Sequence, residues 1–142
     1  MDFASINWLA VVVCVVVSMI SGTIWYNPKT FFPIWWKGIG KTESDTPGSS
    51  DTMGMVWGLT IFGSLMQAIF MALLVNALGG VLGGVSLTSG ITTGFILWLG
   101  FVGPTNLVNK LFAGHGLKIW AIEAGNHLVN FVLFGAILGA WR

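Results

Sequence analysis

Four polar side chains interrupt the last hydrophobic segment of the chain, Lys118 to Arg142. They are Glu123, Asn126, His127 and Asn130, and at about 100° per residue they share an arc of roughly 100° on one helix face. A carboxyl group and an imidazole one turn apart can pass on a proton when burial brings their proton affinities together. The pattern is typical of a proton path, or of a buried network that fixes helix register without moving anything.

The preceding hydrophobic segment, Ser89 to Leu111, carries candidate partners for this face. Pro104 has no N–H to give the carbonyl of Gly100, so a helix should kink there and leave that carbonyl needing another partner. Counted inward from the loop, Asn106 reaches a depth close to that of Glu123. We therefore predict a polar cluster between the third and fourth helices, formed by Glu123, Asn126, His127, Asn130, Asn106 and Asn109.

Other chemistries have weaker support. Glu123 and His127 offer two metal ligands, but zinc needs at least three and the only other histidine, His115, lies in a predicted loop. Cys14 is the single cysteine and has no apparent base. We expect neither a metal nor a cofactor, and an enzyme is the least supported class. With a net charge of +1 and no basic stripe, nucleic acid is not an expected partner.

The composition indicates a membrane protein. Hydrophobic residues make up 55% of the 142 positions and charged residues 8%, against about 25% charged in a soluble domain. Stretches long enough to span a bilayer predict a single all-α, polytopic membrane domain with four transmembrane helices, in contact with lipid. These helices are expected over residues 6–26, 53–78, 89–111 and 118–141. In the last of them, Gly135 and Gly139 form a small-residue pair that lets another helix approach closely.

A short interfacial helix is predicted between the first and second spans, within residues 28–41. Pro33 favours its start, and lysines surround it. Its aromatic neighbours are expected to anchor it at the membrane surface. These are Trp25, Tyr26, Phe31, Phe32, Trp35 and Trp36. A polar loop, residues 42–52, should follow, with Asp51 or Thr52 capping the next helix, and the glycine-rich residues 78–90 favour a tight turn over a re-entrant dip.

Basic residues predict the orientation. Five lysines fall in the first and third connections, whereas Arg142 stands alone on the other side. The positive-inside rule therefore places both longer loops in the cytoplasm and both termini outside, in the bacterial inner membrane.

Several short motifs give the chain a family resemblance. They are Asn7-Trp8-Leu9-Ala10, Trp25-Tyr26-Asn27-Pro28 with Phe32, Trp36 and Gly40, Ala124-Gly125, His127-Leu128-Val129 and Gly135-Ala136-Ile137-Leu138-Gly139-Ala140-Trp141. In this order they resemble an uncharacterised family of small bacterial membrane proteins, the domain-of-unknown-function family seventeen-sixty-one. The resemblance implies four membrane helices and no particular activity. The family pattern more often has an amide at the position of Glu123 and Tyr at that of Asn126, so it supports His127 best.

Two functions remain open from the sequence. The first is a small transporter or channel for protons or a small solute, with its polar path between the third and fourth helices. The second is a structural or accessory subunit whose polar face joins helices, and which has a membrane protein partner. A remoter third is a binding protein or enzyme for a lipid-like ligand gated by residues 31–36. Glycine-lined faces also predict a homo-oligomer.

Overall fold

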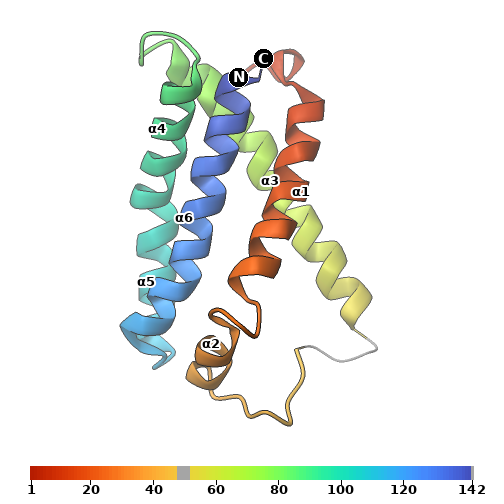
Figure 1. The fold of residues 1–142 in the computed structure, drawn as a ribbon. Helices are drawn as coiled ribbons and strands as arrows, with labels where there is room; N and C mark the ends of the chain where they lie inside the picture. The colour runs from red at the N-terminus through yellow and green to blue at the C-terminus, as the bar shows by residue number, and fades with distance from the viewer. Residues whose placement is uncertain (48–51, 142) are drawn as a thin grey trace.

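The computed structural model describes residues 1–47 and 52–141, and over these residues the fold is all-α. Four helical spans are long and apolar enough to cross a membrane. They are α1 (Trp8–Trp25), α3 (Met53–Gly79), the third span (Leu87–Phe112) and α6 (Gly116–Ala140). The short helix α2 (Phe32–Gly38) lies between the first two, at the end of the bundle opposite the termini (Figure 1). The predicted architecture is confirmed.

Local signals explain where the helices begin. The side chain of Asn7 accepts a hydrogen bond from the N–H of Ala10 and caps α1. Ser86 and Ser89 form a reciprocal capping box at the start of the third span. Thr52 is the N-cap of α3, while Asp51, the other predicted cap, lies outside the described residues, as does the part of the polar loop from 48 to 51. The predicted glycine-rich turn is confirmed, because it joins Gly79 to Leu87 without a re-entrant helix among the residues described there.

The third span changes its helical form midway. It consists of α4 (Leu87–Leu97), a π-helical stretch from Trp98 to Val102, and α5 (Gly103–Phe112). The N–H of Gly103 donates to the carbonyl of Trp98, one residue further back than in an α-helix. Pro104 follows at the start of α5, where its missing N–H is tolerated. The predicted interruption is therefore a π-helical turn that includes Gly100.

Glycines bring α4 and α6 into backbone contact. A Cβ atom at Gly94 would collide with the carbonyl of Phe131, and one at Gly90 or Gly135 would collide with the carbonyl of the other glycine. A Cβ at Gly139 would strike the carbonyl of Ser86. Only residues without a Cβ permit this approach, as in other small-residue interfaces of membrane helices.

Figure 1 shows α1 and α3 crossing near the middle of the bundle and separating toward the α2 end. The apolar core fills the half of the bundle that holds the termini. Its fully buried members include Val11, Cys14, Met71, Leu73 and Phe134. In the other half every residue of α3 from Gly54 to Gly63 is exposed. The bundle is therefore packed at one end and open at the other.

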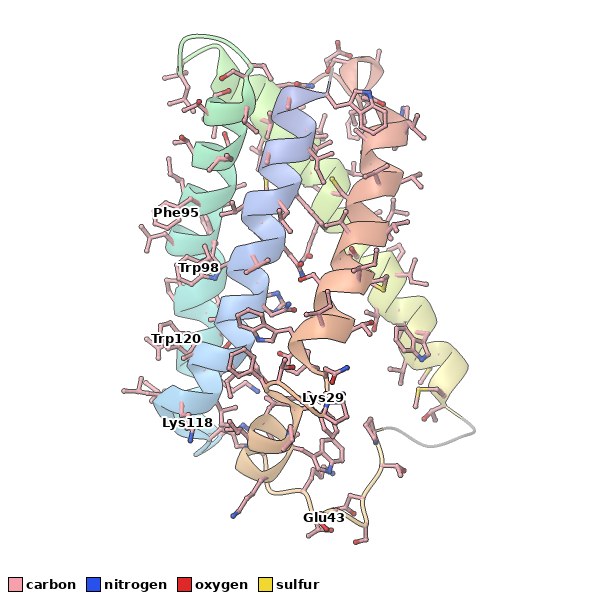
Figure 2. All side chains as sticks on the ribbon, in the orientation of Figure 1. Lys29, Glu43, Phe95, Trp98, Lys118 and Trp120 are labelled. Carbon is pink, nitrogen blue, oxygen red and sulfur yellow. The ribbon has the colours of Figure 1, made fainter. Side chains whose placement is uncertain are left out.

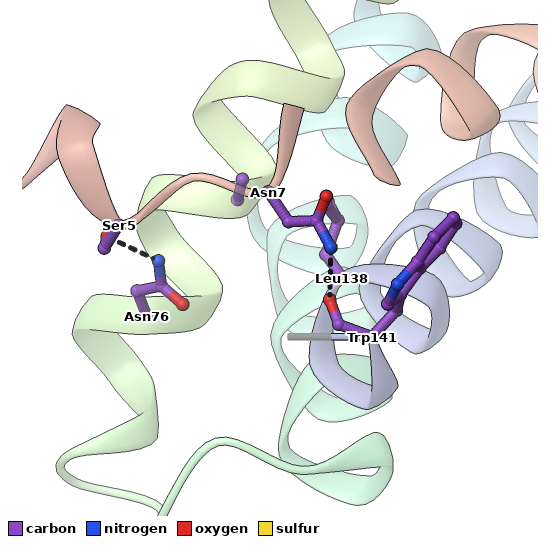
Figure 3. Close-up of a pocket in the computed structure, with 6 residues that line it drawn as sticks. Ser5, Asn7, Asn76, Leu138 and Trp141 are labelled. Carbon is purple, nitrogen blue, oxygen red and sulfur yellow. Dashed lines mark hydrogen bonds between the residues drawn. The ribbon is translucent and has the colours of Figure 1, made fainter. Parts of the chain in front are cut away.

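The two ends of the chain meet at a small pocket whose lining residues form hydrogen bonds (Figure 3). The amide of Asn7 donates to the carbonyl of Trp141 at 3.4 Å, and the amide of Asn76 donates to the hydroxyl of Ser5 at 2.9 Å. These bonds close the packed end of the bundle.

Candidate functional site

The structure separates the polar residues of α6 into two groups. Glu123 turns toward α5 and α2, where its Oε2 lies 2.9 Å from the ammonium nitrogen of Lys110. The amide of Asn106 donates to the same oxygen at 3.4 Å, and the indole N–H of Trp35 donates to Oε1 at 2.8 Å. The carboxylate thus joins three helices, and its charge is matched by one lysine.

Besides the bond from Trp35 to Glu123, two further contacts hold α2 in place. Gly38 at the end of α2 packs on the side chain of Ile119, which would have to move to make room for a Cβ atom. The indole N–H of Trp36 donates to the carbonyl of Thr42 at 2.9 Å, which fixes the chain that leaves α2. We conclude that α2 is docked by polar bonds as well as by its aromatic rings.

Asn126, His127 and Asn130 line a different space, a cavity of about 700 Å³ bounded by α1, α3, α6 and the α2 region. It occupies the half of the molecule where α1 and α3 diverge. Asn130 lies 14 residues into α6 from Gly116, or about 21 Å along a helix of about 37 Å. The inner end of the cavity is therefore near the middle of the span.

Hydrogen-bonding groups gather at this inner end. The hydroxyls of Ser18 on α1 and Ser64 on α3 lie 2.5 Å apart. The amide of Asn126 donates to the hydroxyl of Ser21 at 3.2 Å. Within the described part of the chain, Oδ1 of Asn130 is buried and has no hydrogen-bond partner. A buried acceptor without a donor is costly, and the cavity does not open onto this oxygen.

Aromatic rings surround the outer part of the cavity. Tyr26, Phe32, Trp35 and Trp57 contribute to its wall. The rings of Tyr26 and Trp35 meet edge to face with their centroids 5.0 Å apart. Burial, and then the charge of Glu123, raise the pKa of the Tyr26 phenol, so this group stays neutral. The wall is therefore apolar, except for the phenol of Tyr26 and the indole N–H groups of the two tryptophans.

Formal charge is absent from the cavity lining as far as the structure describes it. Its titratable members are Tyr26 and His127, and no Asp, Glu, Lys or Arg is among the lining residues described. Nor do three or more His, Cys, Asp or Glu side chains cluster as metal ligands in residues 1–47 and 52–141. What the cavity offers a ligand is amides, hydroxyls and one imidazole.

The sequence profile of the family described as "protein of unknown function (DUF1761)" matches residues 9–139. The chain belongs to this family. No curated protein and no solved structure gives a significant match.

Other predicted site residues of this DUF1761 protein lie outside both groups. Asn109 is exposed on α5, and Pro104 is exposed at its start. Of the aromatic anchors, Trp25 donates its indole N–H to the carbonyl of Ile122 on α6 at 2.8 Å. Trp25 thus joins α1 to α6, whereas Phe31 packs against its ring at an interplanar angle of 40° and stays exposed.

The indoles of two further tryptophans also donate hydrogen bonds to backbone carbonyls of a neighbouring span. Trp98 donates to the carbonyl of Ala124 and Trp120 donates to that of Gly103, at 2.8 and 2.9 Å. Figure 2 shows both rings along the side of the bundle that holds the third span, and it shows Lys29, Glu43 and Lys118 near the α2 end.

Two features of the candidate site were not predicted from the sequence. Lys110 was counted only as a basic loop residue, although its spacing from Asn106 puts both on one side of α5 beside Glu123. The polar stripe of α3 was also missed, although it follows helical spacing. Its members in the cavity wall are Thr60, Ser64 and Gln67.

Proposed function

We propose that this DUF1761 protein carries a small polar solute across the membrane through the cavity bounded by α1, α3 and α6. The observation that supports this proposal is a cavity of about 700 Å³ whose inner end, near mid-span, holds Asn126, His127 and Asn130. Polar groups at this depth are expensive and mark substrate paths when they face a cavity. The path proposed here adjoins α1 and α3, rather than running between the third and fourth spans as the sequence suggested.

The packing favours a carrier over a permanently open channel. Beyond the Ser18 and Ser64 pair, the core around Cys14, Ala68 and Met71 is buried. A solute that reached the inner end would need this contact between α1 and α3 to open. Alternating exposure of a mid-membrane site is the usual solution for such a carrier.

In this proposal Glu123 has a structural role. Because it is paired with Lys110 and bonded to Trp35, it holds α2 beside the cavity instead of lining the path. His127, half-buried in the cavity wall, is the group we propose contacts the solute or moves a proton with it.

The proposed setting is the bacterial inner membrane, with the α2 end cytoplasmic and both termini outside. Lys29, Lys37 and Lys41 belong to the connection that holds α2, which supports this orientation under the positive-inside rule. We also propose a homo-oligomer, because the exposed half of α3 offers a surface to a second copy.

The test uses proteoliposomes. Shrinkage and reswelling after mixing with urea or glycerol would report solute entry, and a trapped pH dye would report proton entry. We expect faster entry of a solute than in empty vesicles, and a loss in His127→Ala. His115→Ala is the matched control, since His115 is the loop histidine. Equal entry in wild type and His127→Ala at equal folded protein would refute the proposed path.

A structural or accessory subunit is the second candidate. The bonds from Ser18 to Ser64 and from Asn126 to Ser21 join helices, as interhelical polar contacts do in stable bundles. This function predicts that purification in mild detergent yields a fixed membrane protein partner. Recovery of a pure homo-oligomer alone would count against it.

A further inference from the structure

The imidazole of His127 offers the cavity two ring nitrogens that make no hydrogen bond within residues 1–47 and 52–141. Neither nitrogen is among the polar atoms that are buried without a partner. Both therefore have accessible surface, in contrast to Oδ1 of Asn130. Because His127 lines the cavity, its neutral ring can donate one hydrogen bond and accept another there.

A second polar group, the amide of Gln67, reaches the cavity from α3. Gln67 is exposed and forms no hydrogen bond with the residues described. It lies 14 residues into α3 from Met53, or about 21 Å along a helix of about 40 Å. His127 lies about 17 Å into α6, counted from the same end of the bundle. The polar inner end of the cavity is thus near mid-span on both helices.

The cavity is open to the membrane along α3. Every residue from Gly54 to Gly63 is exposed, so no neighbouring helix of this chain covers this half of α3 among the residues described. Figure 1 shows it standing away from α1. Since Gln67 is exposed as well, the opening extends to mid-span, where a hydrocarbon core about 30 Å thick surrounds the bundle. A molecule dissolved in the bilayer can enter there without crossing water.

The wall of the cavity beyond its polar inner end is largely apolar. None of the lining residues described carries a formal charge. Apolar surface at this depth is covered better by a hydrocarbon chain than by water, and a charged head group would lose its hydration without meeting an opposite charge. The apolar residues of the wall are Met19, Phe32, Trp35, Val56, Trp57 and Leu59.

We propose that the cavity binds an uncharged long-chain amphiphile from the bilayer, whose head group hydrogen-bonds to His127 and whose chain lies along the apolar wall of α3. The volume of about 700 Å³ is within the roughly 300–1,000 Å³ typical of sites for small organic molecules. This site goes beyond the carriage of a small polar solute and does not depend on it. An amphiphile bound at His127 would compete with such a solute for the inner end of the cavity.

Photolabelling of the full chain in proteoliposomes tests the site. One probe is dodecanol with a diazirine in its chain, and the other is the same chain without the hydroxyl. Each is irradiated with increasing amounts of unlabelled dodecanol, and the labelled residues are identified by mass spectrometry. Val56 and Leu59 report on the cavity wall, whereas Ile61 and Phe62 are exposed on α3 outside the lining and report on the surrounding lipid.

We expect the alcohol to label Val56 and Leu59 and unlabelled dodecanol to remove most of that labelling, while Ile61 and Phe62 stay labelled. The probe without the hydroxyl should bind the wall about three- to tenfold more weakly, as expected for one lost hydrogen bond.

Variants of His127 test the contact with the head group. His127→Phe should weaken the binding of the alcohol by the same factor, about three- to tenfold. His127→Gln, which has a donor and an acceptor, should bind more tightly than His127→Phe. His115→Ala, which changes the loop histidine, should leave the binding unchanged.

Three results would overturn the inference: labelling of Val56 and Leu59 that dodecanol does not reduce, equal binding of the two probes, or unchanged binding of the alcohol in His127→Phe. The comparison of probes on the wild type needs no variant, so it decides the matter even if a substitution prevents folding. Saturable labelling without solute entry into vesicles would refute the carrier and leave this site standing. Solute entry without saturable labelling would do the reverse.

Discussion

The ammonium nitrogen of Lys110 lies 2.9 Å from Oε2 of Glu123, across the interface between α5 and α6. Both side chains are largely buried, at 19% and 13% exposure. Removing one partner of such a pair leaves the other charge without compensation, which is more damaging than removing both. This pair, together with the Trp35 bond, explains how a charged residue is tolerated within a membrane helix.

The first prediction concerns this pair. Glu123→Ala should lower the free energy of unfolding by about 1–3 kcal/mol, because it strands Lys110 and frees Trp35. Lys110→Met should cost a similar amount, and the double variant should cost less than the sum. Unfolding in mixed micelles with increasing sodium dodecyl sulfate would measure all three. Strictly additive losses would mean that the two residues do not interact.

The sequence was sufficient for the architecture. Uncharged runs of bilayer length and few charges predict the four spans, and Pro33 predicts the short helix between the first two. The depth estimate that placed Asn106 level with Glu123 also agrees with their contact. These features depend on one helix or on two helices joined by a short loop, so they can be inferred locally.

The site was harder to predict, because it depends on how helices distant in sequence are rotated. The arc on α6 from Glu123 to Asn130 is wide enough to face two neighbours, so Glu123 contacts α5 while His127 and Asn130 face the space beside α1 and α3. Sequence alone does not indicate that α3 splays away from α1. Without that gap, no cavity forms at the polar face.

The second prediction tests the glycine contact between α4 and α6. Gly135→Ala should lower the free energy of unfolding by about 1–3 kcal/mol, because its methyl group would strike the backbone of Gly90 and force the helices apart. Gly58→Ala is the control, since a Cβ there meets no atom within 4 Å among the described residues. That control should be neutral or slightly stabilising, as Ala favours helix over Gly. Equal effects at both positions would disprove the close contact.

The third prediction separates the two buried amides of α6. Asn130→Leu should leave the free energy of unfolding unchanged or raise it, because it replaces an unpaired acceptor by an apolar side chain with the same number of heavy atoms. Asn126→Leu should lower it by about 1 kcal/mol, because it breaks the bond to Ser21. Thermal unfolding without added ligand would distinguish them. If Asn130→Leu proves the more damaging variant, Asn130 serves as a structural bond rather than as an open acceptor.

The last prediction concerns the contact between α1 and α3 that closes the inner end of the cavity. Because the hydroxyls of Ser18 and Ser64 are 2.5 Å apart, cysteines at both positions should form a disulfide on oxidation. In a Cys14→Ala background, which removes the natural thiol, this disulfide should lock the two helices together. A locked carrier should lose solute entry into vesicles, and a reducing agent should restore entry. Each single cysteine variant, treated with the same oxidant, serves as the control. If the oxidised double variant transports as fast as the reduced one, the solute does not pass between Ser18 and Ser64, and the route must lie elsewhere.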